Sequence, residues 1–285
     1  MKVGCHVSIR AGYAAAARTA LRLGARSFQY FPKNPRSLAV KTFDRRDARL
    51  CQAFCREHGL LSIAHTAYPT NLAVDDPDLA AKTVRSILCD LAIAEACGSV
   101  GVVVHFGQYK GEAADPLYGY HLMIHTLNEI LNQWDGDALI LLENNAGQGG
   151  AIGMTLEELT QVRSLLDRPE QVGFCLDTCH AFASGMWRGD NWPEVAEKAR
   201  KLGYFDQLKA IHLNDSVYPS GSRRDRHANI GRGAIGEEAL LTLLQTAELA
   251  ALPVILETPA PADGSHREEI AFLQERLALA GSGQT

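Results

Sequence analysis

The sequence lacks any surplus of positive charge. Its 285 residues include 28 Lys and Arg against 33 Asp and Glu, which gives a formal net charge of −5. Domains that bind nucleic acids are usually basic, so this balance argues mildly against a nucleic-acid partner. Local basic patches can override the overall charge, and cations bound by acidic side chains would offset part of it.

Cysteine pairs and long hydrophobic runs are also lacking. The seven cysteines are odd in number and none has Cys-x-x-Cys spacing, which argues against a disulfide framework and a structural zinc site closed by cysteines. No apolar run approaches the roughly 20 residues of a membrane span. Residues 1–6 lack the apolar segment of a signal peptide. We therefore expect reduced thiols, a cytoplasmic protein and no membrane partner.

What the sequence does contain is a short apolar run followed by a helical stretch, repeated eight times. The apolar runs are residues 3–7, 27–31, 61–65, 101–105, 139–143, 172–177, 209–212 and 254–257. The stretches with helical period are residues 14–23, 44–58, 79–96, 117–132, 156–166, 192–202, 237–247 and 267–278. Continuous apolar runs are typical of parallel strands that are buried on both faces.

This repeat predicts an α/β fold of a single (β/α)8 TIM barrel over residues 1–280, followed by a flexible C-terminal tail at residues 281–285. An open doubly wound sheet is the alternative architecture. It usually carries a Gly-x-Gly-x-x-Gly turn after its first strand, and residues 7–12 do not have that pattern. We expect the barrel to be a monomer.

Six of the apolar runs end in an ionisable residue. These residues are His65, His105, Glu143, Asp177, His212 and Glu257. The carboxyl ends of all barrel strands lie on one face, which carries the active site, so we expect the six side chains to converge. One such residue alone would more often be a hydrogen-bonded core residue. Several buried together are costly unless something neutralises them.

Three more candidates follow the strand ends. His180 stands three residues after Asp177, while Asp225 and His227 alternate in a loop and would project to one side. The set then holds five His, two Asp and two Glu. Metal ions neutralise such groups, and many imidazoles without cysteine favour Zn²⁺, with Mn²⁺ or Fe as competitors. Nine ligands suit two or three ions, an arrangement typical of phosphodiester hydrolysis.

Two other functions remain open at this point. A sugar isomerase or epimerase on the same barrel would use a single divalent ion. Its four ligands would be Glu143, Asp177, His212 and Glu257. That alternative leaves the other five candidates without a role. A non-catalytic metal-binding or DNA-binding protein is the second alternative. The number of ions bound per chain separates phosphodiester hydrolysis, with two or three ions, from the isomerase, with one.

Several long motifs carry a more specific signal. They are residues 4–8 (GCHVS), 104–107 (VHFG), 142–149 (LENNAGQG), 176–185 (LDTCHAFASG), 212–216 (HLNDS), 221–231 (GSRRDRHANIG) and 256–258 (LET). On these motifs the chain resembles the endonuclease IV family, the zinc-dependent endonucleases that act at abasic sites in DNA. The resemblance covers nearly the whole chain.

The resemblance implies a site with three zinc ions. The first would be held by His65, His105 and Glu143; the second by Asp177, His212, Glu257 and a bridging Glu143; the third by His180, Asp225 and His227. It also implies cleavage of duplex DNA on the 5′ side of an abasic site, which leaves a 3′-hydroxyl and a 5′-deoxyribose phosphate. Glu143 would in addition orient or deprotonate the nucleophile.

DNA contacts are expected on the same face. Lys33 and Arg36 follow the second run, and Arg226 lies in the loop between two proposed zinc ligands. Their place after strand ends favours contact with phosphates. By resemblance, Tyr68 would insert into the DNA. Arg36 stands one barrel position away, and from there it would enter the space left by the missing base. The chain departs from the family at Pro69, where a bulkier apolar residue is common, and at Asn145, where Thr is common.

Overall fold

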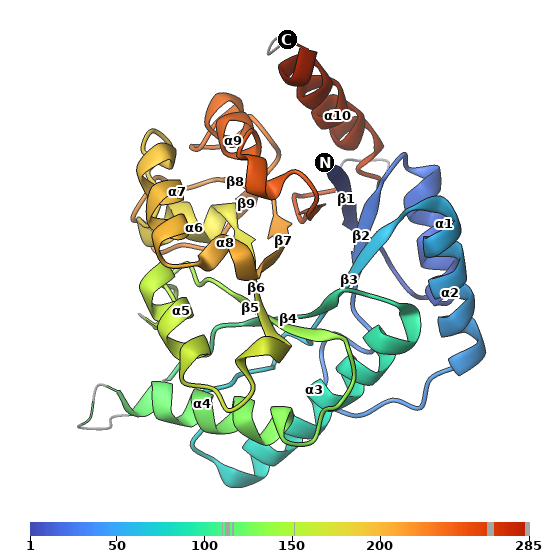
Figure 1. Ribbon diagram of the computed structural model, residues 1–285, viewed down its shortest axis with the longest axis vertical. Coiled ribbons are helices and arrows are strands. Elements are labelled where there is room, and N and C mark those ends of the chain that lie inside the picture. Colours follow the sequence, from blue (N-terminus) through green and yellow to red (C-terminus); the bar gives the residue numbers. More distant parts are fainter. Residues whose placement is uncertain (110, 112–114, 116, 151, 261–264, 283–285) are drawn as a thin grey trace.

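The computed structural model describes residues 1–109, 111, 115, 117–150, 152–260 and 265–282, and its eight parallel strands form a closed barrel within a ring of helices (Figure 1). Around the barrel the strands follow the order β1-β10-β7-β6-β5-β4-β3-β2. Their bounds are β1 Lys2–His6, β2 Ser27–Tyr30, β3 Leu61–His65, β4 Gly101–His105, β5 Leu139–Glu143, β6 Val172–Asp177, β7 Leu208–His212 and β10 Pro253–Leu256. The predicted (β/α)8 barrel is confirmed.

Inside the barrel, a small apolar layer supports the candidate site. It consists of Ile63, Val103, Leu141, Cys175, Ala210 and Ile255, which are all fully buried. Each of these residues stands two positions before one of the six ionisable residues at the strand ends. Because side chains repeat every two residues along a strand, both sets point into the barrel. The ionisable groups therefore gather at its mouth, above an apolar plug.

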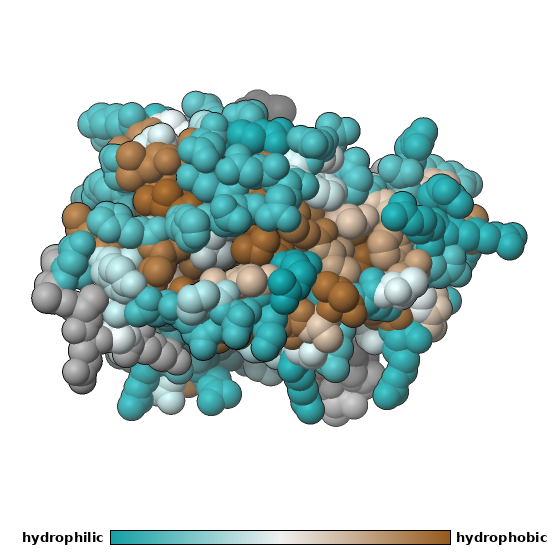
Figure 2. Space-filling model, turned by 90° about the horizontal axis from the view of Figure 1, so that it is seen from below, coloured by the Kyte–Doolittle hydropathy of each residue, from teal (hydrophilic) through white to brown (hydrophobic). Residues whose placement is uncertain are grey.

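The helices cover the outside of the barrel and run close to the predicted stretches. Their bounds are α1 Tyr13–Arg22, α2 Arg45–His58, α3 Pro77–Cys97, α4 Tyr118–Leu131, α5 Leu156–Ser164, α7 Trp192–Lys201, α9 Glu237–Leu244 and α10 Arg267–Ser282. Local signals set their ends: the Asp44 side chain accepts hydrogen bonds from two amides of the first turn of α2, and Gly59 ends that helix in the left-handed conformation. Hydrophilic side chains dominate the face seen in Figure 2, with apolar ones between them.

The sequence analysis missed several short elements, some of which follow strand ends at the mouth of the barrel. They are α6 Thr178–Ser184, α8 Tyr204–Gln207, the two-residue strands β8 Asp215–Ser216 and β9 His227–Ala228, and the 3-10 turns Pro169–Gln171 and Ala247–Leu249. Two predicted ligands expected in loops therefore lie in regular structure: His180 on α6 and His227 on β9. Strand β9 pairs antiparallel with β8, which fixes the backbone of His227.

Three further expectations can be compared with the structure. All seven cysteines are free thiols, as expected. Helix α10 continues to Ser282, two residues past the predicted start of the tail, and residues 283–285 lie outside the described residues. Within the described part of the chain, every helix is too short or too polar to cross a membrane.

Candidate metal centre

The structure brings His65, His105 and Glu143 together at the ends of β3, β4 and β5. Each of the two His Nε2 atoms lies 3.5 Å from the Glu143 Oε2 atom. The side chain of Glu143 is 1 % exposed, whereas that of His105 is 46 % exposed. This first group has one ligand atom per residue within 4.8 Å of the others, a spacing that could hold one metal ion.

A second group lies deeper and consists of Glu143, Asp177, His212 and Glu257. The Nδ1 atom of His212 lies 3.0 Å from Glu143 Oε1 and 3.2 Å from Glu257 Oε2. The side chains of Asp177 and His212 are fully buried. Glu143 belongs to both groups, and it directs one carboxylate oxygen toward each of them. A carboxylate in this position is suited to bridge two cations.

The third group contains the residues that follow the strand ends: His180, Asp225 and His227. The Asp225 carboxylate lies between the two imidazoles, with each His Nε2 atom 3.3 Å from one of its oxygens. The His227 Nε2 atom is also 3.7 Å from an oxygen of Asp177, which connects this group to the second. The nine predicted ligands thus form three adjoining groups.

Hydrogen bonds on the far side of the imidazoles hold four of the rings in place. The Nδ1 atoms of three rings face backbone carbonyl oxygens: His65 that of Thr66 at 2.8 Å, His180 that of Asn144 at 2.9 Å, and His227 that of Glu257 at 3.2 Å. In the fourth ring, His212, it is Nε2 that is engaged, at 2.7 Å from the side-chain Oε1 of Gln29. Such bonds leave the other ring nitrogen free to bind a metal.

Two buried atoms at the centre have no hydrogen-bond partner among the described residues. They are Oε2 of Glu143 and Nε2 of His227, and both face the other candidate ligands. A buried polar atom without a partner is costly, so unpartnered atoms inside a ligand set indicate an absent partner. The donor set of imidazole nitrogens and carboxylate oxygens fits a divalent transition metal, above all zinc.

The charges of the site show that its carboxylates need cations beside them. Burial alone would lower the pKa of His180, but the carboxylates of Asp177 and Asp225 raise it well above its ordinary value. Burial would likewise raise the pKa of Glu143, yet His105 and His212 hold it well below its ordinary range. The carboxylates therefore require cations. Imidazolium ions supply them without a metal, and metal ions can take their place when the imidazoles are neutral.

A fourth combination, Asp177, Cys179 and His227, also lies within metal-binding distance. Burial, with the Asp177 carboxylate nearby, raises the pKa of the Cys179 thiol to about 12. Because the thiolate is the metal-binding form, a thiol that stays protonated is a poor ligand. We therefore describe Cys179, which is fully buried, as a packing residue.

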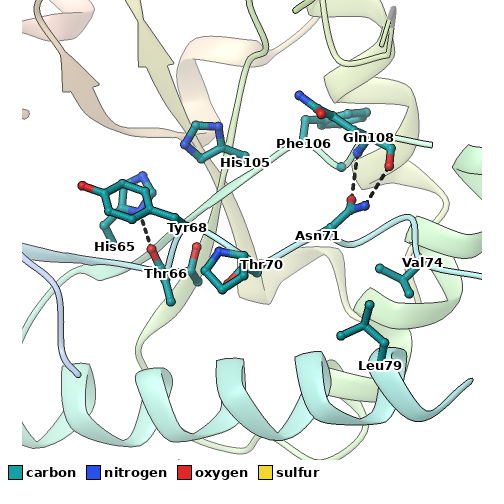
Figure 3. A pocket seen from close by; sticks show the side chains of 13 residues that line it. His65, Thr66, Tyr68, Thr70, Asn71, Val74, Leu79, His105, Phe106 and Gln108 are labelled. Atoms are coloured by element: carbon teal, nitrogen blue, oxygen red, sulfur yellow. Dashed lines mark hydrogen bonds between the residues drawn. The ribbon is translucent and has the colours of Figure 1, made fainter. Parts of the chain in front are cut away.

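The candidate centre opens into a cavity of about 370 Å³, whose wall includes His6, Phe31, Tyr68 and His266. A second groove of about 400 Å³ adjoins it, running from His65 and His105 toward Leu79. Figure 3 shows this groove, with the rings of His65, Tyr68 and His105 at one end and Asn71 and Gln108 at the other. The site is thus open at the mouth of the barrel.

The expected DNA-contacting residues at the rim have different environments. The Tyr68 side chain is 72 % exposed, and its ring centroid lies 5.1 Å from that of Phe31. Arg36 and Arg226 are exposed as well. The backbone amide of Tyr68 donates to the Pro35 carbonyl oxygen at 2.8 Å, which ties the loop of Tyr68 to the loop of Arg36. These three side chains are free to meet a ligand.

The structure corrects the expectation for Lys33. Its side chain is 2 % exposed, and its Nζ atom donates to both carboxylate oxygens of Asp90, at 2.8 and 2.7 Å. An ammonium group that is buried in an ion pair cannot reach a phosphate. Its place after a strand end suggested a surface position, but Asp90 lies on α3, far away in the sequence, and draws it inward. Lys33 anchors the base of the Arg36 loop instead.

The departure at Asn145 has a local explanation. Its side-chain amide donates to the carbonyl oxygens of Phe106 and Ile152 and is buried. The amide therefore joins the loops that follow β4 and β5. The neighbouring Asn144 accepts from the Asp177 amide and donates to the Asp177 carbonyl oxygen, which holds the end of β6 beside β5. Pro69, the other departure, is exposed next to Tyr68.

Sequence reasoning missed polar residues that hold the ligands. Asn214 donates to Asp177 Oδ2 at 2.8 Å and accepts from the Glu257 amide at 2.9 Å. Gln29 contacts both His212 and Glu257. A signal was available for Gln29, because it is a polar residue inside the apolar run 27–31. What it contacts could not be derived, since its partners lie more than 180 residues away.

Comparisons with known proteins show what the chain is similar to. The family model described as a xylose isomerase-like TIM barrel matches residues 17–276. A probable endonuclease 4 from Symbiobacterium thermophilum is 45 % identical, over 97 % of this chain and 100 % of that protein. The crystal structure of endonuclease IV from Thermus thermophilus has a TM-score of 0.84 and 31 % identity, covering 96 % of this chain and 100 % of that one.

A D-tagatose 3-epimerase-like protein is a more distant structural neighbour. It has a TM-score of 0.74 at 19 % identity, and the alignment covers 100 % of both chains. At that identity the likeness shows the barrel fold alone, because one barrel type hosts many unrelated reactions. The functional conclusion therefore has to come from the ligand groups and from the much closer relatives.

Proposed function

The chain belongs to the endonuclease IV family of xylose isomerase-like TIM barrels, and from that premise we propose that it is a zinc-dependent DNA-repair endonuclease that cuts at abasic sites. It would hydrolyse the phosphodiester 5′ to the abasic site in duplex DNA and leave a 3′-hydroxyl and a 5′-deoxyribose phosphate. The observation that carries the proposal is the set of three adjoining ligand groups at the mouth of the barrel.

In this proposal each group of ligands holds one zinc ion. The first group is His65, His105 and Glu143; the second is Glu143, Asp177, His212 and Glu257; the third is His180, Asp225 and His227. Closely spaced zinc ions, when bound, supply a nucleophile from water at neutral pH and stabilise charge on phosphate oxygens. Action in the cytoplasm as a monomer remains a prediction.

Glu143 has the central role among the protein's own groups. Its carboxylate lies between the first and second ligand groups, with Oε2 facing His65 and His105 and Oε1 facing His212. The neighbouring imidazoles keep its pKa low, so the group is a carboxylate at neutral pH. We assign to it the bridging of two cations and the orientation of the attacking water.

The rim would supply recognition. An abasic nucleotide has no base to read, so selectivity has to come from easy extrusion of the backbone and from filling the gap. Tyr68 is exposed beside the cavity, and its loop is tied to the loop of Arg36, so both can act on the same stretch of DNA. Arg226 is exposed beside the ligand Asp225 and would contact a phosphate.

The second candidate is a sugar isomerase or epimerase with one metal ion. The specific observation in its favour is that Glu143, Asp177, His212 and Glu257 form a complete group on their own. It gives no role to the other five residues, which belong to two further groups and include a buried His180. The arrangement of the remaining ligands therefore favours the endonuclease.

One experiment separates the two functions. The purified protein is loaded with zinc, its metal content is measured by mass spectrometry, and it is then given a duplex with a single abasic analogue. The endonuclease proposal expects close to three ions per chain and one nick 5′ to the analogue. A single ion, with no nick but with epimerisation of a ketose, would overturn it in favour of the isomerase.

A further inference from the structure

The Gln29 side chain lies across the mouth of the barrel, between two ligands of the second group. It is fully buried at the end of β2, and strands β1 and β10 separate β2 from β7 in the barrel. Its Oε1 atom is 2.7 Å from Nε2 of His212, and its Nε2 atom donates to Glu257 Oε1 at 2.6 Å. The same amide nitrogen is 3.3 Å from Nδ1 of His6.

The partners of this amide permit only one orientation. Glu257 is a carboxylate, which accepts hydrogen bonds and cannot donate them, so the group that faces it has to be the NH2 of Gln29. The carbonyl oxygen Oε1 then has to face His212. Because Oε1 can only accept, His212 must carry a proton on Nε2. A flipped amide would place two acceptors against each other at Glu257.

This orientation decides which nitrogen of His212 is available. With the proton held on Nε2, the lone pair of the neutral ring lies on Nδ1, which faces Glu143 and Glu257 at 3.0 and 3.2 Å. The rings of His65, His180 and His227 are arranged in the opposite way, with Nδ1 toward a carbonyl oxygen and Nε2 toward the centre. Backbone carbonyls hold those three rings, whereas His212 depends on a side chain.

We propose that Gln29 is a positioning residue that selects Nδ1 of His212 as a metal ligand and at the same time orients the Glu257 carboxylate. The inference rests on the proposed function only in taking the second ligand group as a zinc site. A single amide holds two of the four ligands of that group. Loss of a residue that forms hydrogen bonds with metal ligands typically lowers metal affinity by about 10–100-fold.

The first test needs no substitution. Long-range ¹H–¹⁵N correlation spectra of the zinc-loaded protein report which nitrogen of each imidazole carries a proton. We expect His212 to be protonated on Nε2, and the rings of His65, His180 and His227 to be protonated on Nδ1 and so to act as internal references. A proton on Nδ1 of His212 would overturn the proposal, whatever the effect of any variant.

The second test compares Gln29→Leu and Gln29→Met with Tyr30→Phe in a competition titration against a chromophoric zinc chelator. Tyr30→Phe is a matched control. It removes one buried hydrogen bond, between the Tyr30 and Ser99 hydroxyls at 2.9 Å, from the same strand and at a residue outside the ligand groups. We expect both Gln29 variants to weaken the binding of one ion by about 10–100-fold and the control to bind like the wild type. Gln29 variants with wild-type affinity for every ion would refute the proposal.

These measurements also separate the inference from the proposed function. A wild-type protein that binds zinc but leaves abasic duplex uncut would contradict the proposed function, while the proton position and the zinc affinities would still decide the role of Gln29. Conversely, Gln29 variants that bind zinc normally would remove the positioning role and leave the endonuclease intact. If Gln29→Leu does not fold, Gln29→Met and the wild-type spectra still give a result.

Discussion

The floor and the rim of the barrel mouth differ in almost every physical respect. The floor consists of candidate metal ligands such as Asp177 and His212, which are fully buried and hydrogen-bonded on the side away from the centre. The rim consists of Tyr68, Arg36 and Arg226, which are exposed and stand on loops. The floor is a preorganised centre whose residues hold one another in place, whereas each rim side chain is surrounded by solvent and independent of the others.

This difference predicts how the two regions respond to substitution. In the floor, one missing group leaves several buried partners uncompensated, so losses are large and not additive. At the rim, water replaces whatever is removed, and each loss is limited to the contact itself. A floor variant with a small effect, or a rim variant with a very large one, would break the comparison.

The largest effect is expected for Glu143→Gln at the centre of the floor. The amide keeps the size of the side chain but loses the charge that is shared by two ligand groups, so cleavage of an abasic duplex should fall by more than about 10³-fold. The far-ultraviolet circular dichroism spectrum should stay unchanged. Cutting at close to the wild-type rate would contradict the metal-centred mechanism.

The next largest effect is expected for Lys33→Met, below the rim loop. Removing one partner of the buried Lys33–Asp90 pair should lower the free energy of unfolding by about 3–5 kcal/mol, measured by urea denaturation. The double variant Lys33→Met with Asp90→Leu should lose less of the free energy of unfolding, because no buried charge is left without a partner. If the single and the double variant lost the same free energy of unfolding, the unpaired Asp90 charge would not be the cause of the destabilisation.

The same variant has a pH dependence of known sign. Burial raises the pKa of Asp90 to about 6 even with Lys33 attracting its charge, and the unfolded value is close to 3.8. The carboxyl group is therefore mostly neutral at pH 5 and charged at pH 8 in the folded protein, and a raised carboxyl pKa contributes stability at low pH that is lost as the pH rises through the folded value. The loss of the Lys33 cation matters most when Asp90 is charged. Lys33→Met should therefore be more destabilising at pH 8 than at pH 5; the reverse order would contradict the assignment.

A smaller effect is expected for His227→Asn, at the partly exposed edge of the floor. Zinc content should fall by about one ion per chain, because the third ligand group loses a member. The charge on the leaving oxygen develops only in the transition state, so kcat should fall, by about 10²-fold, more than DNA affinity. Weakened DNA binding at unchanged kcat would show that His227 acts in DNA recognition and not in the chemical step.

At the rim, Tyr68→Ala and Arg36→Ala should each weaken binding of abasic duplex by about 1–3 kcal/mol, the size of one lost stacking contact. Zinc content should not change, since both residues stand outside the three ligand groups. Arg22→Ala is the control, because Arg22 lies in the last turn of α1, at the opposite end of the barrel. Wild-type affinity in both rim variants would eliminate the insertion hypothesis.

The smallest effect is expected for Arg226→Ala. Loss of a single phosphate contact should weaken binding to every DNA sequence alike and lower the slope of log K against log salt concentration by about 0.9. Fluorescence anisotropy at several salt concentrations measures this slope. An unchanged slope would show that Arg226 does not contact a DNA phosphate, and Tyr68 and Arg36 would be left as the proposed DNA-contacting residues of the rim.

The floor could be predicted from the sequence to a large extent. Inward-facing side chains recur every two residues in a strand, so an apolar run that ends in His, Asp or Glu specifies both the buried plug and the group above it. Leu141 and Glu143 on β5 show this, as do Ile63 and His65 on β3. The remaining candidates, His180, Asp225 and His227, followed from their spacing after the strand ends, and the family motifs implied the same residues.

The rim was harder to predict, because a position after a strand end does not determine where a long side chain goes. Lys33 and Arg36 lie in the same loop, yet Lys33 is buried against Asp90 and Arg36 is exposed. The hairpin of β8 and β9 was missed because two-residue strands carry no periodic pattern.

By itself the sequence determined the barrel, its strand ends and most of the candidate metal ligands, since these follow from local periodicity and from residue chemistry at each position. The tertiary structure alone decided which distant side chains meet. It placed Asp90 under Lys33, the Pro35 carbonyl against the Tyr68 amide, and Gln29 between His212 and Glu257. Contacts of this kind depend on the closure of the barrel, which brings Gln29 and Glu257, 228 positions apart, within hydrogen-bonding distance. No local pattern encodes which side chains that closure brings together.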